Sequence, residues 1–546
     1  MINLEKLKSV FKGEAAGDVD TLIKYSHDAS VFEIKPEIVV YPKDVADIKT
    51  LVKFAAQENT PSNHVSITAR SAGTDMGGGP LSDSIVADVT RHINHIKEVG
   101  IDYAITEPGV YYRDFEKETL KHDLIFPSYP ASKELCAMGG IIANNSGGEK
   151  TLSYGKTENY IKEIKMVLRD GNEYTFKPIT MEELEYKKKT PHLEGEIYTK
   201  IHELIKNNYD LIKSAKPKVS KNSAGYYLWN VWDKEKGIFD LTKLIVGSQG
   251  TLGIITQARL RLVKPKKYSS MLVVFMNDTK ELAKIVNHIL KFKPESLESY
   301  DDHTFKVALK FFSEIVKRLK GDVITLGIRF LPEFWAALTG GVPKLVMLAE
   351  FTGDNIDETE AVAKSAQQSL KEFGLKTKIE NGDEANKYWV VRRESFNLLR
   401  NKIKNMRAAP FIDDIIVNPE KLPEFLPKLY QILNEYKNLI YTLVGHVGDG
   451  NFHIIPLVSV FEKNLAGTIL ELSQKVFSLV LEYGGSITAE HNDGLIRTPY
   501  LKQMYGEKIY NLFGEVKKIF DPNNIFNPGK KFGGNLEESL KHLRTN

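Results

Sequence analysis

The chain has 546 residues, of which 42% are hydrophobic and 27% are charged, a balance typical of globular proteins. Its 74 Lys and Arg residues nearly offset its 71 Asp and Glu residues, and this excludes a strongly basic nucleic-acid-binding protein. The single cysteine, Cys136, excludes disulfides within the chain and a cysteine-ligated iron–sulfur cluster.

The N-terminal segment, residues 1–30, is predicted to be helical and is rich in lysine. It lacks the apolar core of a signal peptide, and no apolar run in the sequence approaches the roughly 18 residues of a membrane helix. We therefore expect a cytoplasmic protein of at least two domains.

Strands and helices alternate over residues 31–265, which predicts an α/β domain. Residues 37–42 (EIVVYP) predict a strand, and residues 44–57 predict an amphipathic helix with Asp44 as its N-cap. The segments HVSITAR and SIVADV predict two further strands, and residues 100–122 predict a strand followed by a helix.

The composition shifts at Pro265, where a second, α+β domain is predicted for residues 266–500. It begins with the strand SSMLVVFM and the helix ELAKIVNHILKF. Phe330, Phe334 and Trp335 are interpreted as core residues, with a docking surface for a redox partner or a membrane as the alternative. Residues 501–546 are predicted to form a helical tail that ends in the fixed turn FDPNNIFNPGK.

Three glycine-rich stretches could bring the backbone close to an anionic ligand. They are SAGTDMGGG after Arg70, GGIIANNSGG from Gly139, and GSQGTLG from Gly247. Glycine permits positive φ angles and lets successive N–H groups converge on a phosphate. Each stretch taken alone is better explained as a tight turn, and none has the G-x-G-x-x-G spacing of a Rossmann nucleotide site.

The segment YTLVGHVGDGNFHIIPLV predicts a β-hairpin. Asp449-Gly450 is typical of a two-residue type I′ turn, which would place His446 directly opposite His453. Opposed side chains have Cβ atoms about 5 Å apart, so both imidazoles could bind one metal ion. Two hydrogen-bonded core histidines would explain the same pattern.

A third ligand is expected from the segment that follows the helix NLAGTILELSQKVFSLVLEY. That helix should end at Gly484-Gly485. Residues 486–489 then predict a strand that ends at Glu490 and His491, an arrangement that favours a functional site over a core element.

The ordered motifs ARSAGT, FPSYPAS, MGGIIANNSGG, YGKT, GSQGTLGII and NPGK resemble the flavin-binding pattern of vanillyl-alcohol-oxidase (PCMH) type FAD proteins. Within that group the chain is most similar to the D-lactate and D-2-hydroxyglutarate dehydrogenases and to the FAD subunit of glycolate oxidase. The resemblance implies an α+β protein in which a two-part FAD-binding domain carries an α+β substrate domain. The C-terminal segment would pack back on the FAD domain.

The resemblance implies noncovalent FAD, because no histidine lies in the 70–74 loop. The implied FAD-binding residues are Arg70, Ser71, Ala72, Gly73, Thr74, Pro130, Ser132, Gly139, Gly140, Asn144, Ser146, Gly147, Tyr154, Thr157, Ile255 and Asn527. The chain departs from the family at Ser71 and Ala72, where relatives carry glycine, and at Tyr129, where they carry aspartate.

By the same resemblance, His446, His453 and Glu490 bind a divalent metal, and His491 is the catalytic base. Two histidines and a carboxylate suit zinc, manganese or iron. Arg393, with Arg392 as the alternative, would bind the α-carboxylate of the substrate by a two-point contact.

The implied function is a FAD-dependent dehydrogenase that oxidises a D-2-hydroxy acid and passes electrons to a separate acceptor. Candidate acceptors are an iron–sulfur protein, an electron-transfer flavoprotein, a cytochrome or a quinone. Ile412 and Ile455 stand where 2-hydroxyglutarate enzymes carry a lysine and an asparagine, which favours D-lactate or glycolate. The alternatives are an O₂-using oxidase, a non-catalytic flavin electron-transfer subunit and a zinc hydrolase.

Overall fold

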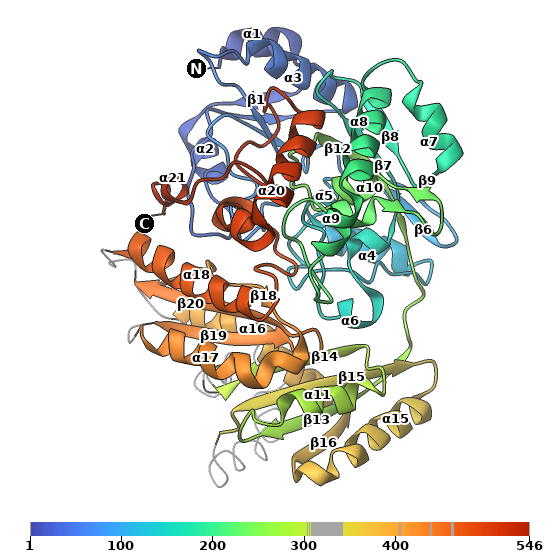
Figure 1. Ribbon diagram of the computed structural model, residues 1–546, viewed down its shortest axis with the longest axis vertical. Helices are drawn as coiled ribbons and strands as arrows, with labels where there is room; N and C mark the ends of the chain where they lie inside the picture. Colours follow the sequence, from blue (N-terminus) through green and yellow to red (C-terminus); the bar gives the residue numbers. More distant parts are fainter. Residues whose placement is uncertain are drawn as a thin grey trace.

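The computed structural model describes residues 2–302, 304, 306, 342–402, 406–436, 439–459 and 464–544 (Figure 1). For residues 394–402 it describes the backbone alone. Phe330, Phe334 and Trp335, the predicted core or docking residues, lie outside the described residues.

A four-stranded sheet forms near the N-terminus, in the order β1-β2-β4-β3. Its strands are β1 (Glu14–Ala16), β2 (Ile38–Tyr41), β3 (Ile67–Arg70) and β4 (Ile85–Asp88), and its helices are α1 (Leu4–Val10), α2 (Val19–Tyr25) and α3 (Val45–Glu58). Strands β2, β4 and β3 run parallel, as the βα alternation predicts. Asp44 caps α3 by accepting a hydrogen bond from the backbone N–H of Asp47, which confirms the predicted helix start.

A second, five-stranded antiparallel sheet has the order β5-β6-β12-β7-β8. Its strands are β5 (Ile96–Val99), β6 (Tyr103–Thr106), β7 (Ile161–Val167), β8 (Glu173–Phe176) and β12 (Ile254–Arg261). A small sheet joins β9 (Ile179–Thr180), β10 (Trp232–Asp233) and β11 (Ile238–Phe239). The surrounding helices are α4 (Tyr112–Leu120), α5 (Met138–Asn144), α6 (Thr151–Tyr154), α7 (Met181–Lys188), α8 (Leu193–Asn207), α9 (Tyr209–Ser214) and α10 (Thr242–Ile245), with 3₁₀ turns η1 (Thr157–Asn159) and η2 (Leu228–Asn230).

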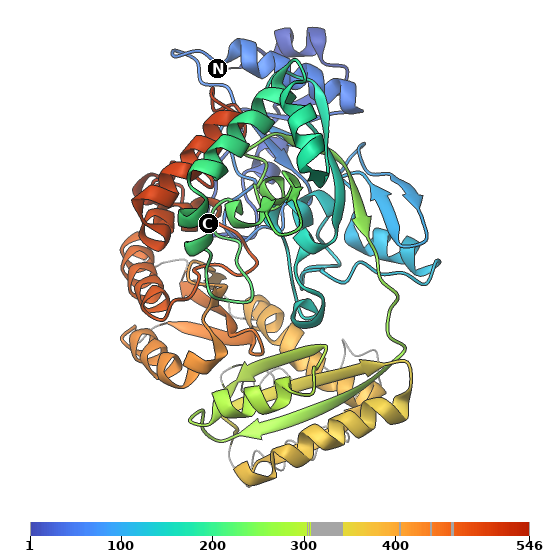
Figure 2. The same cartoon turned by 45° about the vertical axis from the view of Figure 1, so that its right-hand side comes forward.

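An extended link around Pro265 leads from β12 to the eight-stranded sheet that contains the histidine hairpin (Figure 2). Its strand order is β16-β13-β15-β14-β19-β20-β17, with β18 also paired to β20, and every pair is antiparallel. The strands are β13 (Tyr268–Met276), β14 (Ser296–Asp301), β15 (Leu345–Gly353), β16 (Lys376–Asn381), β17 (Met406–Ala408), β18 (Ile415–Ile416), β19 (Ile440–His446) and β20 (Asn451–Ser459).

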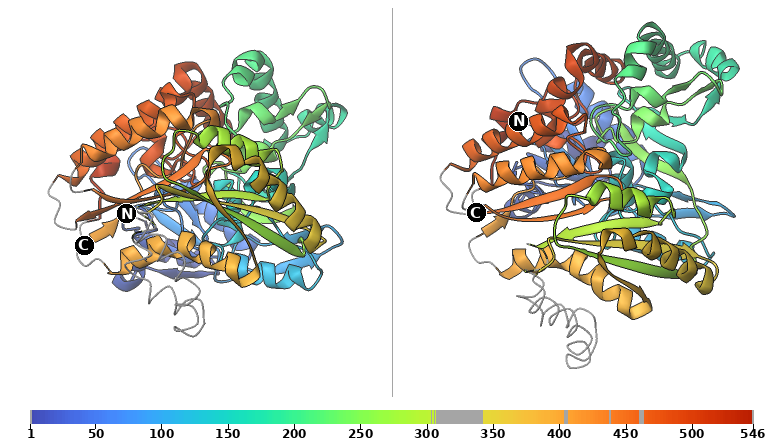
Figure 3. Two further views of the ribbon diagram at one scale, coloured as in Figure 1. Left: turned by 90° about the horizontal axis from the view of Figure 1, so that it is seen from below. Right: turned by 60° about the horizontal axis from the view of Figure 1, so that its bottom comes forward.

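Helices cover both faces of this sheet (Figures 1 and 3). They are α11 (Leu282–Leu290), α15 (Ile356–Ser369), α17 (Leu422–Asn434) and α18 (Leu465–Glu482) on one face and α16 (Gly382–Lys402) on the other, with 3₁₀ turns η3 (Lys371–Phe373) and η4 (Pro419–Lys421). Alternate residues of β13 serve the two layers, since Leu272 and Val274 pack in the larger core whereas Met271 and Val273 pack against α16. On β19 and β20, Leu443 and Ile454 likewise belong to the larger core, which puts His446 and His453 on the face of α16.

The C-terminal tail returns to the first sheet (Figure 1). It contains α19 (Gly494–Arg497), η5 (Thr498–Tyr500), α20 (Leu501–Phe520) and α21 (Leu536–Leu540). The backbone N–H of Ile67 donates to the carbonyl of Ile525 at 2.7 Å, and that of Asn527 donates to the carbonyl of Ile67 at 3.0 Å. The end of the chain therefore extends the sheet beside the first glycine-rich loop.

Candidate active site

The histidine hairpin has a wider turn than the sequence predicts. His446 pairs with Asn451 and Val444 pairs with His453, so the predicted register, with His446 opposite His453, is wrong. The turn comprises four residues, 447–450, because the N–H of Gly448 donates to the carbonyl of Leu297 and the N–H of Asp449 donates to that of His446. Gly450 has a φ of 72°, and a Cβ there would lie 1.9 Å from the carbonyl oxygen of Val417.

The two histidines nevertheless share one face, because a shift of two residues preserves side-chain orientation on a strand. Their ring centroids lie 5.3 Å apart. With Glu490 they form a buried group whose potential ligand atoms all lie within 4.8 Å of one another. Nε2 of His446 is 3.5 Å from Oε2 of Glu490.

Glu490 and His491 lie on an irregular segment, so the strand predicted for residues 486–489 is wrong. Only Ser486 makes a β-bridge, to Ile416. The segment is held instead by Asp414, whose Oδ2 accepts hydrogen bonds from Thr488 Oγ1 and from the N–H groups of residues 489, 490 and 491, at 2.7–2.9 Å. One buried carboxylate thus fixes the backbone of both predicted site residues.

His491 is oriented by a second buried carboxylate. Its Nδ1 lies 2.8 Å from Oδ2 of Asp413, and Nδ1 of His453 lies 3.2 Å from the other oxygen of the same group. The two imidazoles are stacked at 4.9 Å with planes 24° apart. Burial opposes a charge on His491, but the carboxylates of Asp414 and Asp413 outweigh it and raise the pKa of His491 to about 9.

Further buried charges surround the cluster. His446 Nδ1 lies 2.6 Å from Oε1 of Glu298, which is also ion-paired with Arg392. Lys221, which is 1% exposed, donates to Oε1 of Glu490 at 2.6 Å and lies 3.0 Å from Asp449. Burial opposes ionisation of Glu490, but Lys221 and His446 prevail and hold its pKa well below the ordinary value.

Sequence reasoning did not identify Lys221, Glu298 or Asp413 as part of the cluster. Lys221 stands in the lysine-rich stretch KPKVSKN, which has the composition of a surface loop. The one available signal was Asp413-Asp414 between apolar residues, because two adjacent carboxylates in a buried segment require partners.

The two candidate arginines have different partners. Arg392 is buried and pairs with Glu298, the carboxylate that also contacts His446. Arg393 is 42% exposed, lies over the ring of Trp389, and makes a two-point contact with Glu149 at 2.7 Å. Glu149 directly follows Gly148 of the second glycine-rich stretch.

The glycine-rich stretches converge on the tail. Asn527 donates through Nδ2 to the carbonyls of Gly79 and Gln249, and its Oδ1 accepts from Thr68. A Cβ added at Gly140 would meet only the Cβ of Ser71, at 3.9 Å. This open, half-buried position fits the close approach of a flavin to the backbone.

The other predicted flavin residues occupy varied positions. The guanidinium of Arg70 donates to the carbonyls of Tyr25 and His27 rather than facing an open space. Thr157 donates to the carbonyl of Ser146, and Tyr154 donates to Glu295. Most remaining members of the set lie in or next to the three stretches, namely Ser71, Ala72, Gly73, Thr74, Gly139, Asn144, Gly147 and Ile255. Pro130 and Ser132 belong to the segment before the second stretch, and a Cβ at Gly148 would lie 3.3 Å from Cα of Pro130.

The glycine-rich stretches contact the histidine cluster directly. A Cβ at Gly147 would lie 3.1 Å from Oε1 of Glu490. Asn492, next to His491, donates to the carbonyls of Asn144 and Gly247, and its Oδ1 accepts from Lys531 of the tail at 2.6 Å.

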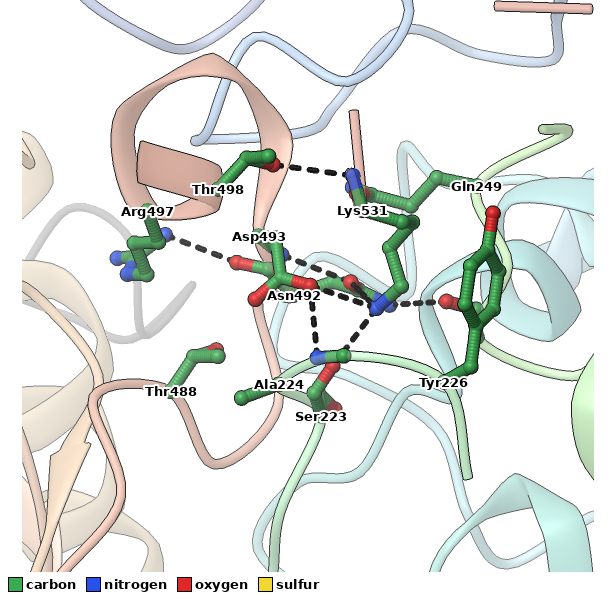
Figure 4. A network of polar contacts seen from close by, with 12 residues as sticks. Ser223, Ala224, Tyr226, Gln249, Thr488, Asn492, Asp493, Arg497, Thr498 and Lys531 are labelled. Atoms are coloured by element: carbon green, nitrogen blue, oxygen red, sulfur yellow. Dashed lines mark hydrogen bonds and ion pairs between the residues drawn. The ribbon is translucent and has the colours of Figure 1, made fainter. Parts of the chain in front are cut away.

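Lys531 is fully buried and also pairs with Asp493 at 2.8 Å (Figure 4). In Figure 4 its ammonium group lies between the side chains of Asn492 and Asp493 and the backbone near Ser223. The candidate flavin cradle, the cluster and the tail therefore form one connected structure.

Two regions of the chain match models of known protein families. Residues 36–177 match the FAD binding domain family, and residues 265–531 match the C-terminal domain of FAD linked oxidases.

Curated relatives are distant but cover nearly the whole chain. The D-2-hydroxyglutarate dehydrogenase of Pseudomonas putida is 28% identical over 536 residues, which cover 96% of this chain and 51% of that protein. The chain thus spans about half the length of that relative. The glycolate oxidase subunit GlcD of Bacillus subtilis is 26% identical, with 93% of this chain and 92% of that protein covered. The D-lactate dehydrogenase of Archaeoglobus fulgidus is also 26% identical, with 90% of each chain covered.

Solved structures share the fold. p-Cresol methylhydroxylase with substrate bound has a TM-score of 0.64 at 16% identity, with 98% of this chain and 96% of that chain covered. The 4-ethylphenol oxidase of Gulosibacter chungangensis has a TM-score of 0.64 at 15% identity, with 95% and 94% covered. These matches confirm the predicted α+β fold of vanillyl-alcohol-oxidase type.

Proposed function

The chain belongs to the FAD-linked oxidase family, and from that premise we propose that it is a dehydrogenase for D-2-hydroxy acids that uses noncovalent FAD and a divalent metal. The observation that carries the proposal is the contact between the glycine-rich cradle and a buried cluster of three candidate ligands and one base. Gly147 adjoins Glu490, and Asn492 joins the segment of His491 to two glycine-rich stretches.

The charge of the cluster suits a divalent cation. Within the described residues, five buried carboxylates around the cluster stand against four buried cations, which leaves one negative charge when the histidines are neutral. The carboxylates are Glu298, Asp413, Asp414, Asp449 and Glu490, and the cations are Lys156, Lys221, Arg392 and Arg497. A cluster of this charge that offers two imidazoles and a carboxylate fits Zn²⁺, Mn²⁺ or Fe²⁺ at His446, His453 and Glu490.

When bound, the metal supplies a positive charge that acidifies the substrate hydroxyl, and FAD supplies the acceptor for the hydride from C2. In its unprotonated form, which prevails above its pKa of about 9, His491 accepts the hydroxyl proton at Nε2, while its Nδ1 faces Asp413. Arg393 binds the α-carboxylate, exchanging Glu149 for the substrate in a two-point contact. The buried surroundings exclude water, which strengthens these charge interactions.

A monocarboxylate such as D-lactate or glycolate is the proposed substrate. Ile412 is fully buried and Ile455 is 8% exposed, two residues beyond His453 on the same strand face. Neither side chain could stabilise a second carboxylate. Electrons then pass to a carrier other than this chain, because one cysteine cannot hold an iron–sulfur cluster. Within the described part of the chain, no helix combines the length and apolar character needed to cross a membrane.

The proposal is tested by anaerobic bleaching of the flavin in the purified yellow protein. The panel comprises D- and L-lactate, glycolate and D-2-hydroxyglutarate, each with and without added Zn²⁺, Mn²⁺ or Fe²⁺. D-lactate or glycolate should bleach the flavin, and the metal should accelerate the reaction. His491→Ala should slow bleaching by about 10²–10⁴-fold, the usual contribution of a positioned base. The matched control is His288→Ala on α11, which should leave the rate of bleaching unchanged.

Three results would contradict parts of the proposal. If the flavin of His491→Ala is bleached at the wild-type rate, His491 is not the catalytic base. A protein that bleaches only with D-2-hydroxyglutarate would reject the monocarboxylate preference. Rapid reoxidation of the reduced flavin by air would identify an oxidase instead of a dehydrogenase.

A further inference from the structure

Asp413 lies between the candidate base and one candidate metal ligand. Its Oδ1 lies 3.2 Å from Nδ1 of His453, and its Oδ2 lies 2.8 Å from Nδ1 of His491. We propose that Asp413 is a positioning residue that holds both histidines in the same tautomer, with the proton on Nδ1 and with Nε2 available for the metal or the substrate. This inference rests on the proposed function, because it assigns the two Nε2 atoms to that chemistry.

The argument follows from the chemistry of the two groups. An ionised carboxylate is an acceptor only, so each of its oxygens favours a protonated nitrogen opposite it. The carboxylate favours a proton on Nδ1 whether the ring is neutral or protonated. In the neutral ring, which carries one N–H, Nε2 then has a free lone pair. Oδ1 of Asp413 has hydrogen-bond geometry with Nδ1 of His453, whereas its Oδ2 makes a close electrostatic contact with Nδ1 of His491 that lacks hydrogen-bond geometry. Both contacts favour a proton on Nδ1, so one carboxylate biases both tautomers.

The ring geometry agrees with a shared orientation. The imidazoles of His453 and His491 are stacked, with ring centroids 4.9 Å apart and planes 24° apart. Because Nδ1 of each ring faces Asp413, the Nε2 atom, separated from it by Cε1, is directed away from that carboxylate. One ring nitrogen of His453 lies within 4.8 Å of ligand atoms of both His446 and Glu490. Because Nδ1 of His453 faces Asp413, we assign this nitrogen as Nε2. His446 is arranged in the same way, with its Nδ1 on Glu298.

Asp413 is itself firmly held. Its side chain is fully buried, and its carbonyl oxygen accepts a hydrogen bond from Nη2 of Arg497 at 2.8 Å. Asp414, the next residue, binds the backbone of residues 489–491. The carboxylate and the segment that bears His491 are therefore tied to the same piece of chain.

A competing interpretation is a cation site on the Nδ1 side, because Asp413, His453 and His491 also have ligand atoms within 4.8 Å of one another. A metal bound there requires both Nδ1 atoms to be unprotonated. The two interpretations therefore predict opposite protonation of the same atoms.

The first experiment measures ¹⁵N chemical shifts of the histidine side chains in the FAD-loaded protein, with and without Zn²⁺. The signals are assigned by their loss in His453→Gln and His491→Gln. We expect a protonated Nδ1 on both histidines, with Zn²⁺ shifting Nε2 of His453. An unprotonated Nδ1 on either ring overturns the proposal. The measurement needs no substrate, so it remains decisive if the protein oxidises no hydroxy acid.

The second experiment uses Asp413→Asn with Asp449→Asn as its control. Both variants remove one buried negative charge beside the cluster, but Asp449 contacts Lys221 rather than a histidine. An amide has one acceptor oxygen and one donor nitrogen, so it can accept an N–H from only one of the two rings. Asp413→Asn should therefore lose about 10–100-fold, beyond the control, in Zn²⁺ affinity or in the rate of flavin reduction.

Both variants are compared at equal FAD content and with thermal unfolding measured alongside. Recovery of activity and Zn²⁺ affinity in Asp413→Glu would support an orienting carboxylate. If Asp413→Asn keeps both properties within twofold of Asp449→Asn, Asp413 does not position the histidines.

Discussion

Lys221 shows how strongly a single residue can shape the cluster. Its ammonium group is 1% exposed and lies between Glu490 at 2.6 Å and Asp449 at 3.0 Å. A buried charge pair adds little net stability, but removing one partner leaves an uncompensated charge that costs several kcal/mol.

We expect Lys221→Met to lower the free energy of unfolding by about 3–5 kcal/mol, because two buried carboxylates lose their cation. Zn²⁺ should restore more stability in this variant than in the wild type, since it replaces the missing charge at Glu490. Chemical denaturation with and without Zn²⁺ measures both effects. Lys284→Met on α11, where the lysine side chain is 70% exposed, is the control and should change the stability by less than about 0.5 kcal/mol. An equally small loss in Lys221→Met would contradict this account.

Glu149 occupies the guanidinium of Arg393 in the same two-point geometry that a substrate carboxylate would use. A partly exposed pair of this kind contributes about 0.2–1 kcal/mol. If Arg393 binds the substrate as proposed, the substrate must overcome that contribution.

Glu149→Gln should therefore tighten substrate binding by about two- to fivefold. The dissociation constant from flavin spectral titration under anaerobic conditions is the measurement. Glu196→Gln is a matched control. Glu196 makes a similar two-oxygen contact with Arg169, and neither residue belongs to the candidate site. Unchanged or weaker binding in Glu149→Gln would exclude Arg393 as the carboxylate receptor.

At the scale of elements, the first glycine-rich loop is organised by two carboxylates. Asp75 accepts hydrogen bonds from the N–H groups of Gly77 and Gly79, and Asp28 accepts from that of Gly78. Burial and the nearby Asp75 raise the pKa of Asp28 to about 7.

This shift makes the loop sensitive to pH. The folded state retains a proton on Asp28 between the ordinary pKa of 3.8 and about 7, whereas the unfolded chain has released it. Stability therefore falls as pH rises through this window and levels off above it.

Asp28→Asn should remove that dependence and be more stable than the wild type by about 1–2 kcal/mol at pH 8, after allowance for partial exposure, with little difference near pH 4. Urea denaturation across this pH range measures the effect. Asp210→Asn, at an exposed position on α9, should keep the wild-type pH profile. If Asp28→Asn keeps the wild-type dependence of stability on pH, the raised pKa of Asp28 does not cause that dependence.

At the scale of the whole molecule, the tail closes the structure by returning to the first sheet. Asn527 has a φ of 39° and is 1% exposed, and its side chain joins Thr68, Gly79 and Gln249. The two glycine-rich stretches that it bridges lie about 170 residues apart in sequence.

Asn527→Ala should weaken FAD binding by about tenfold, because the hydrogen bonds between the tail and both stretches are lost. Equilibrium dialysis of the flavin measures the affinity. Asn524→Ala is the matched control, since Asn524 also has a left-handed backbone, with a φ of 55°, but is exposed. Equal affinities in the two variants would show that backbone strain, not the bridging contacts, accounts for any loss.

The sequence by itself located several local elements and supplied the hypothesis for the chemistry of the site. Periodicity and capping residues located α3 with Asp44 as its N-cap, and composition located the change at Pro265, because both signals are encoded by neighbouring residues. Ordered motifs identified the FAD-binding region and grouped His446, His453 and Glu490.

Only the tertiary structure decided how those residues meet. The turn between His446 and His453 widened because Leu297, about 150 residues earlier, anchors Gly448. The segment of Glu490 and His491 is irregular because Asp414 satisfies its backbone in place of a strand partner. Lys221 and Asp413 are part of the cluster because they are buried against it. Burial depends on contacts between distant parts of the chain rather than on local sequence.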